Sequence, residues 1–169
     1  EQKIDLGMIR ANAVTKDLRA EPICVVKYVV AVPRRLAPRR LTLESALLDC
    51  PHATIGGDGE LGRKIHELVC ALGGTFRSEL ICESAGQCMA AVRTGGYAAV
   101  VPAQVMENNP GLDCEVVDDE GLASLDRPVV LAWSPRNLEA LGSGFVTFRD
   151  NLKAALIEEA EQRGMTKRE

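Results

Sequence analysis

The sequence predicts a soluble α/β protein in which short strands alternate with helices. Three observations support this. Apolar runs of strand length end at proline or glycine, an amphipathic pattern spans residues 60–72, and another helix start follows at Ser84. Alternation of this kind is typical of strand–helix–strand units with largely parallel pairing. The 169 residues are enough for one domain or two small lobes.

Some of the expected strands are apolar runs that end at a proline. The longest run, Ile23–Val32, ends at Pro33, which cannot donate a hydrogen bond to a neighbouring strand. Aromatic residues make up only 4% of the chain, so the core is expected to be aliphatic. Strands are expected at residues 4–9, 23–32, 53–55, 78–83, 97–101, 113–117 and 129–133.

Local signals also mark the helices. Leu61, Ile65 and Val69 recur on one face of the second helix. Ser84 with Gln87 three residues later forms a capping box that begins the third. Helices are expected over 43–48, 60–72, 85–92 and, after an N-cap at Thr147, 148–162.

Composition excludes several functions. A net charge of −4 gives no general attraction to nucleic acid. No apolar run reaches the roughly 20 residues of a membrane helix, since Lys27 interrupts the longest. The six cysteines show no C-x-x-C spacing, so we expect small buried residues in a reducing cytoplasm, with no metal site and no cofactor.

The loop at Gly57–Gly62 spells G-x-G-x-x-G, the pattern of a dinucleotide-binding turn. Glu83 lies about where a ribose-binding carboxylate belongs. Against this reading, Asp58 and Glu60 would repel a pyrophosphate by about 1–4 kcal/mol per pair. The preceding strand is also short and bounded by Pro51, so the nucleotide is the weaker interpretation.

A small anion is the stronger candidate ligand. Two helices begin just after strand ends, near residues 60 and 85, and helix starts carry free N–H groups and positive dipole ends. Arg10, just past the first strand, would add a two-pronged cationic donor. The alternative, that Arg10 and both helix starts are merely solvated, stays open.

No catalytic group is evident. The two histidines, His52 in a turn-like setting and His66 in a helix, have no nucleophile beside them in the sequence. The run Asp118–Glu120 is typical of a solvated loop rather than an acid–base pair. We therefore expect a protein that is not an enzyme.

Six segments, taken in order along the chain, form a further pattern. They are KIDLGMIR (3–10), LRAEPICVVKYVVAVPRRLA (18–37), LTLESALLDCPHATIGG (41–57), ESAGQCMAAVRTGGYAAVVP (83–102), VVLAWSPRN (129–137) and FVTFRDNL (145–152). Their order and spacing resemble the effector-binding domain of LysR-type transcriptional regulators. The resemblance implies two α/β lobes like those of type 2 periplasmic binding proteins, with mixed sheets flanked by helices. Residues 1–24 and 105–169 would form an incomplete first lobe, and 25–104 the second.

The resemblance also implies a function. Such a domain senses a small effector between its lobes and acts as a homodimer or homotetramer, with DNA bound only through an N-terminal region. That region and the family's first strand and helix are not in this sequence, which indicates an N-terminal truncation. A solute-binding protein of a transporter is the alternative, although six free cysteines fit an oxidising compartment poorly. The implied effector contacts are Arg10, Gly56, Gly57, Asp58, Gly59, Glu60, Ser84 and Gln87.

Overall fold

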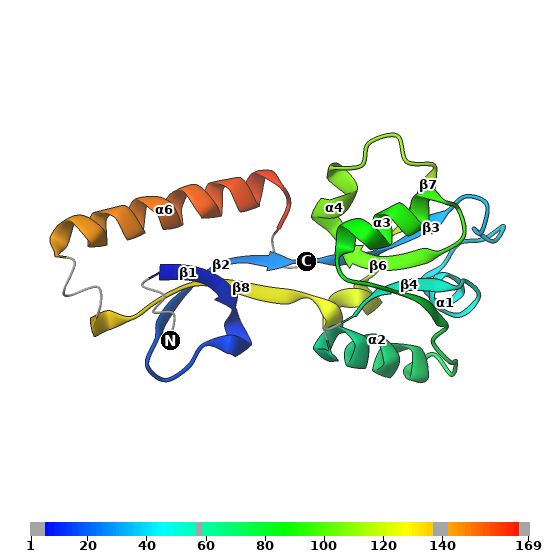
Figure 1. Cartoon of the computed structure of the whole chain (residues 1–169), viewed down its shortest axis with the longest axis horizontal. Helices are drawn as coiled ribbons and strands as arrows, with labels where there is room; N and C mark the ends of the chain where they lie inside the picture. The colour runs from blue at the N-terminus through cyan, green and yellow to red at the C-terminus, as the bar shows by residue number, and fades with distance from the viewer. Residues whose placement is uncertain (1–5, 57–58, 137–141, 166–169) are drawn as a thin grey trace. The chain divides into compact units, whose positions relative to one another are not determined.

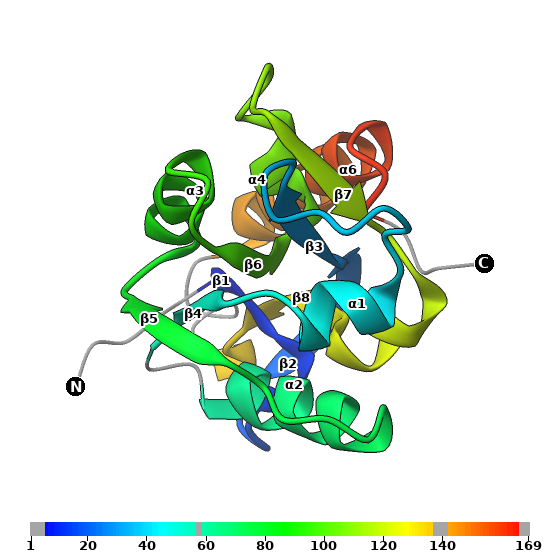
Figure 2. The same cartoon turned by 90° about the vertical axis from the view of Figure 1, so that its right-hand side faces the viewer.

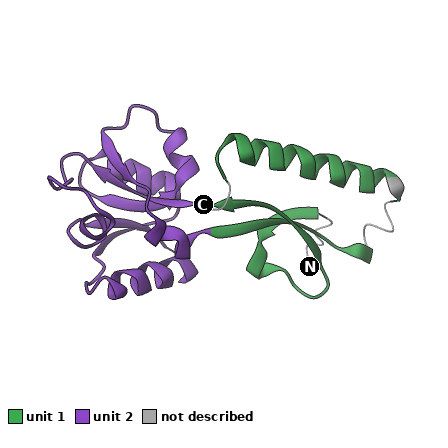
Figure 3. Ribbon diagram, turned by 180° about the vertical axis from the view of Figure 1, so that it is seen from behind, with its two compact units in different colours: residues 1–26, 127–169 green, residues 27–126 purple. Residues whose placement is uncertain are grey.

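The computed structural model describes residues 6–56, 59–136 and 142–165. It divides the chain into two compact units, residues 1–26 with 127–169 (unit 1) and residues 27–126 (unit 2) (Figure 3). The second lobe was expected to end at residue 104, whereas unit 2 extends to Asp126. The reason is that a later strand pairs with the sheet of unit 2, as described below.

Unit 1 is a three-stranded sheet with one long helix beside it (Figure 1). The strand order is β1-β8-β2, and both pairings are antiparallel. The prediction of largely parallel pairing was wrong for this unit. Its elements are β1 (Leu6–Arg10), η1 (Ala11–Ala13), β2 (Arg19–Val26), β8 (Arg127–Trp133) and α6 (Ser143–Gln162).

Charged side chains help to hold α6 on its sheet. Lys153 forms an ion pair with Glu21 of β2. The guanidinium of Arg149 lies 4.6 Å from the ring centroid of Trp133 in β8, close enough for a cation–π contact. Both contacts bring the polar ends of long side chains to the sheet, in which β1 and β2 are mostly half-buried and β8 is mostly buried.

Unit 2 is built on a five-stranded mixed sheet of order β5-β4-β6-β3-β7. β4 runs parallel to both β5 and β6, while β3 runs antiparallel to β6 and β7. The parallel prediction therefore holds for the three strands that alternate with helices. The strands are β3 (Tyr28–Pro33), β4 (His52–Ile55), β5 (Ser78–Cys82), β6 (Ala98–Pro102) and β7 (Cys114–Val117).

Two helices cover opposite faces of this sheet, α2 on one and α3 on the other (Figures 1 and 2). The core under α3 is built mainly of small aliphatic side chains, as the scarcity of aromatic residues predicts. β7 lies beside β3, which explains why unit 2 extends beyond residue 104. The remaining elements are α1 (Leu43–Leu48), α2 (Gly59–Ala71), α3 (Ala85–Arg93), α4 (Ala103–Glu107) and η2 (Glu120–Leu125).

Two predicted elements were wrong in their bounds. The apolar run Ile23–Val32 is not one strand, because the chain leaves one sheet after Val26 and enters another at Tyr28. The last helix begins at Ser143 rather than after Thr147, with Gly142 at its N-cap in a left-handed conformation of φ 77°.

Candidate functional site

The candidate site lies where β4 and β5 end and their connecting loops diverge. From β4 the chain passes through α2 to β5 on one side, and from β5 it returns through α3 to β6 on the other side of β4. The helices that follow β4 and β5, α2 and α3, lie on opposite faces of the sheet (Figure 2). A reversal of strand order of this kind is the usual ligand-binding position of an open α/β sheet.

A backbone hydrogen bond joins the two loops. The Gly56 N–H, just after β4, donates to the carbonyl of Cys82, the last residue of β5, at 2.7 Å. A Cβ at Gly56 would lie 2.6 Å from Cγ2 of Ile81, closer than side chains approach one another. A methyl group at position 56 would therefore require the Ile81 side chain to shift. The neighbouring Ile81, which is 76% exposed, was not among the predicted site residues.

We expect Gly56→Ala to destabilise unit 2 by about 1–2 kcal/mol, because the new methyl group overlaps the β-branched Ile81 side chain. Ile81→Ala alone should change stability by less than about 0.5 kcal/mol, since that side chain is exposed. In the double variant most of the loss should be recovered, which urea denaturation of the four proteins measures as a coupling energy. Additive losses would show that the Gly56–Ile81 contact is not the cause.

The start of α3 has the predicted cap. Ser84 Oγ accepts a hydrogen bond from the Gln87 N–H at 3.3 Å, and Gln87 Oε1 accepts one from the Glu83 N–H at 2.7 Å. Both side chains are exposed. This cap fixes the positive end of α3 at the carboxyl end of β5, which favours an anion there.

At the start of α2, Gly59 is the first helical residue and Glu60 forms an ion pair with Lys64 at 3.8 Å. Gly57 and Asp58 lie outside the described residues. A Cβ at Gly62 would meet nothing within 4 Å. The third glycine of a dinucleotide-binding turn permits close packing of helix and strand, so the nucleotide interpretation gains no support here.

Arg10 is the last residue of β1 in unit 1, and its side chain is exposed. The other described contacts, from Gly56 to Gln87, belong to unit 2. The participation of Arg10 in the same site stays a prediction.

His52 is not in a turn, contrary to the sequence-based expectation. It lies in β4, its side chain is fully buried, and Nε2 is 3.0 Å from the carbonyl oxygen of Ala46. Its ring packs against Phe76, with 4.7 Å between centroids. Burial lowers the pKa of His52 to about 4, so the ring is neutral near pH 7 and acts as a core residue.

The cysteines divide by exposure. Cys50, Cys82 and Cys88 are buried as predicted, whereas Cys70 is exposed on α2. Burial raises the pKa of Cys88 to about 12, which keeps it a thiol. Among the described residues no group of three His, Cys, Asp or Glu side chains is arranged to hold a metal ion. No helix in the described parts of the chain has the length and apolarity needed to cross a bilayer.

Solved structures share this fold. The cofactor-binding domain of the Cbl transcriptional regulator aligns with a TM-score of 0.68 and 19% identity, over 97% of this chain and 72% of that one. A putative transcriptional regulator from Vibrio parahaemolyticus gives 0.68 and 19%, over 94% and 70%. Full-length CbnR complexed with its target DNA gives 0.55 and 16%, over 78% of this chain but only 44% of that one. These likenesses confirm the predicted mixed sheets flanked by helices.

Sequence comparison assigns the family. No curated protein matches the chain. A sequence model described as the LysR substrate binding domain matches residues 1–155. Such domains of transcriptional regulators bind effectors rather than catalyse reactions, which agrees with the expectation from the sequence. Because the match covers most of the 169 residues, the chain belongs to the family of LysR substrate binding domains.

Proposed function

We propose that this chain is the ligand-sensing domain of a LysR-type transcriptional regulator that acts in the cytoplasm. It binds a small anionic effector at the loops that begin α2 and α3, with Arg10 as a further contact. The observation that carries this proposal is the Gly56–Cys82 hydrogen bond, because it holds the two diverging loops together at one point of the sheet.

The two helix starts and Arg10 support an anionic effector. The capped start of α3 presents the positive end of a nine-residue helix. α2 begins at the same end of the sheet, because β4 and β5 are parallel. A guanidinium such as that of Arg10 forms two parallel hydrogen bonds to a carboxylate, a geometry that lysine does not reproduce. Carboxylates and sugar acids are therefore the effectors to test first.

Effector binding regulates only if the effector prefers one arrangement of the protein over another. A preference of about 1–3 kcal/mol is typical of coupling between distant sites. In the intact regulator, a homodimer or homotetramer, this preference shifts the placement of the DNA-binding regions. The full-length relative CbnR was solved with its target DNA, in keeping with that role.

The test is a thermal-shift screen of the chain with carboxylates and sugar acids. At a ligand concentration of 100 times Kd, we expect a stabilisation of about 2.7 kcal/mol. The stabilisation should fall strongly in Arg10→Ala and persist in Arg19→Ala. Arg19 is a suitable control because it is an exposed arginine of the same sheet, paired near the opposite end of β8.

Equal stabilisation of the wild type and Arg10→Ala would remove Arg10 from the site. Failure of every anion in the screen would contradict the proposed effector class. Footprinting of the full-length protein on DNA, with and without the identified effector, then tests the regulatory role.

A further inference from the structure

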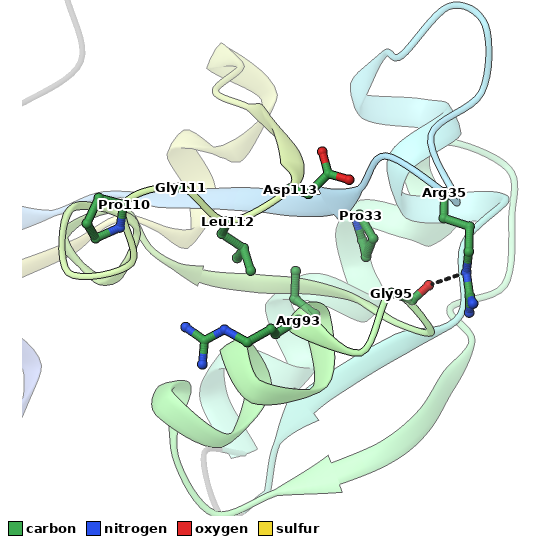
Figure 4. Close-up of a pocket in the computed structure, with 9 residues that line it drawn as sticks. Pro33, Arg35, Arg93, Gly95, Pro110, Gly111, Leu112 and Asp113 are labelled. Atoms are coloured by element: carbon green, nitrogen blue, oxygen red, sulfur yellow. Dashed lines mark hydrogen bonds between the residues drawn. The ribbon is translucent and has the colours of Figure 1, made fainter.

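A second hollow lies at the other end of the unit 2 sheet. It has a volume of about 410 Å³ and is bounded by the end of β3, the end of α3 and the loop at residues 110–113 (Figure 4). We call it the Arg35–Arg93 groove. It adjoins the start of β6, and β6 runs parallel to β4. The groove is therefore at the opposite end of these strands from the candidate effector loops.

Two arginines of the groove are held by neutral acceptors. Arg35 Nε donates to the carbonyl of Gly95 at 3.1 Å, and Arg93 Nη2 donates to Oδ1 of Asn109 at 2.9 Å. Within the described part of the chain, neither arginine forms an ion pair with a carboxylate. Both guanidinium groups are positioned by these bonds, yet their charges remain without a counter-charge.

The negative groups nearby do not cancel these charges. Asp113 borders the groove, but its carboxylate pairs with Arg34 at 3.1 Å. In Figure 4 that carboxylate is turned away from Leu112 and the groove floor. The carboxyl end of α3 contributes only about half a negative charge, against two full positive charges. The groove is thus locally cationic in a chain whose net charge is −4.

The shape of the groove restricts the kind of ligand that fits, in addition to its positive charge. Figure 4 shows the guanidinium groups of Arg35 and Arg93 well separated, with Leu112 and Pro33 between them. Val92, which is buried, also lines the groove. A complementary ligand has an anionic group at each end and an apolar body between. The volume of the groove, about 410 Å³, falls within the range of about 300–1,000 Å³ typical of small-molecule sites.

We propose that the Arg35–Arg93 groove is a second binding site, and that it takes an elongated dicarboxylate with a hydrocarbon body. Each carboxylate accepts charge-assisted hydrogen bonds from one guanidinium. The hydrocarbon lies on Leu112, Val92 and Pro33. Because this site shares no residue with the candidate effector loops, it does not depend on the proposed function.

The test compares dicarboxylates with monocarboxylates of equal length. Succinate, adipate and suberate are titrated into the ¹⁵N-labelled chain, with butyrate, hexanoate and octanoate as matched controls. Binding is followed through the amide signals of Gly95 and Gly111, which both line the groove. We expect at least one dicarboxylate to bind about tenfold more tightly than its monocarboxylate, because the second charged contact contributes on the order of 1.4 kcal/mol.

Arg35→Gln and Arg93→Gln should each abolish this preference. Arg63→Gln should preserve it, because Arg63 is an exposed arginine of α2 paired with Glu67. Arg10→Ala should also preserve it, which separates this site from the proposed effector site. The proposal is overturned if no dicarboxylate shifts the Gly95 and Gly111 signals. It is equally overturned if the paired acids bind alike, or if both arginine variants bind as the wild type does.

Discussion

Replacing Leu61 with alanine is expected to lower the free energy of unfolding by about 3 kcal/mol, within the range of about 2–5 kcal/mol for a buried leucine. Leu61 is only 2% exposed and lies in the first turns of α2, directly after the candidate effector loop. Alanine favours a helix at least as strongly as leucine does. The loss therefore reports packing and the cavity left behind, and urea denaturation measures it.

Glu67→Ala is the matched control on the same helix. Glu67 is exposed and forms an i,i+4 ion pair with Arg63, a contact that typically contributes about 0.3–0.5 kcal/mol. We therefore expect a loss below about 0.5 kcal/mol for this control. A Leu61→Ala loss no larger than that of the control would contradict the packing of α2 on its sheet.

The second large effect is a fall in stability between about pH 6.5 and pH 4. The pKa of His52 is lowered by burial from 6.5 to about 4 in the folded protein. Between these values the unfolded state binds more protons than the folded state, so stability rises with pH. The contribution of His52 to the free energy of unfolding is complete above about pH 6.5. It amounts to about 3 kcal/mol, at 1.36 kcal/mol per pKa unit.

Urea denaturation at half-unit steps from pH 7.5 to pH 5 measures this slope, in a range where most carboxylates remain ionised. His52→Leu should flatten the slope, even though it removes the hydrogen bond with the Ala46 carbonyl. A slope that survives in His52→Leu would assign the pH dependence to other groups.

Local sequence patterns were sufficient for α1, α2 and α3 but did not predict α4. α1 has its predicted bounds, and Ser84 caps α3 by accepting from the Gln87 N–H, although the Gln87 side chain accepts from Glu83 rather than from Ser84. These predictions succeeded because the contacts involved lie within one or two helical turns. The ends of β4 and β5, after which the effector contacts were predicted, are neighbours, since parallel adjacent strands end at the same edge of the sheet.

Patterns within one segment did not reveal which sheet a strand would join. Nothing local in Ile23–Val32 distinguishes a single strand from two strands in separate sheets that meet near Lys27. His52 looked like a turn residue beside Pro51, yet pairing with β5 and β6 buries it in β4. The close contact of Gly56 with Ile81 likewise joins residues that are distant in the sequence.

The sequence by itself determined the α/β class, helices α1, α2 and α3 and the family to which the chain belongs, because each depends on short-range periodicity, caps or ordered motifs. Only the tertiary structure decided the division at Asp126, the burial of His52 and the pairing of Arg35 with Gly95 at the groove. Those features depend on strand pairing and on contacts between distant segments. Their free energies are set by burial and by neighbouring groups that a linear pattern does not specify.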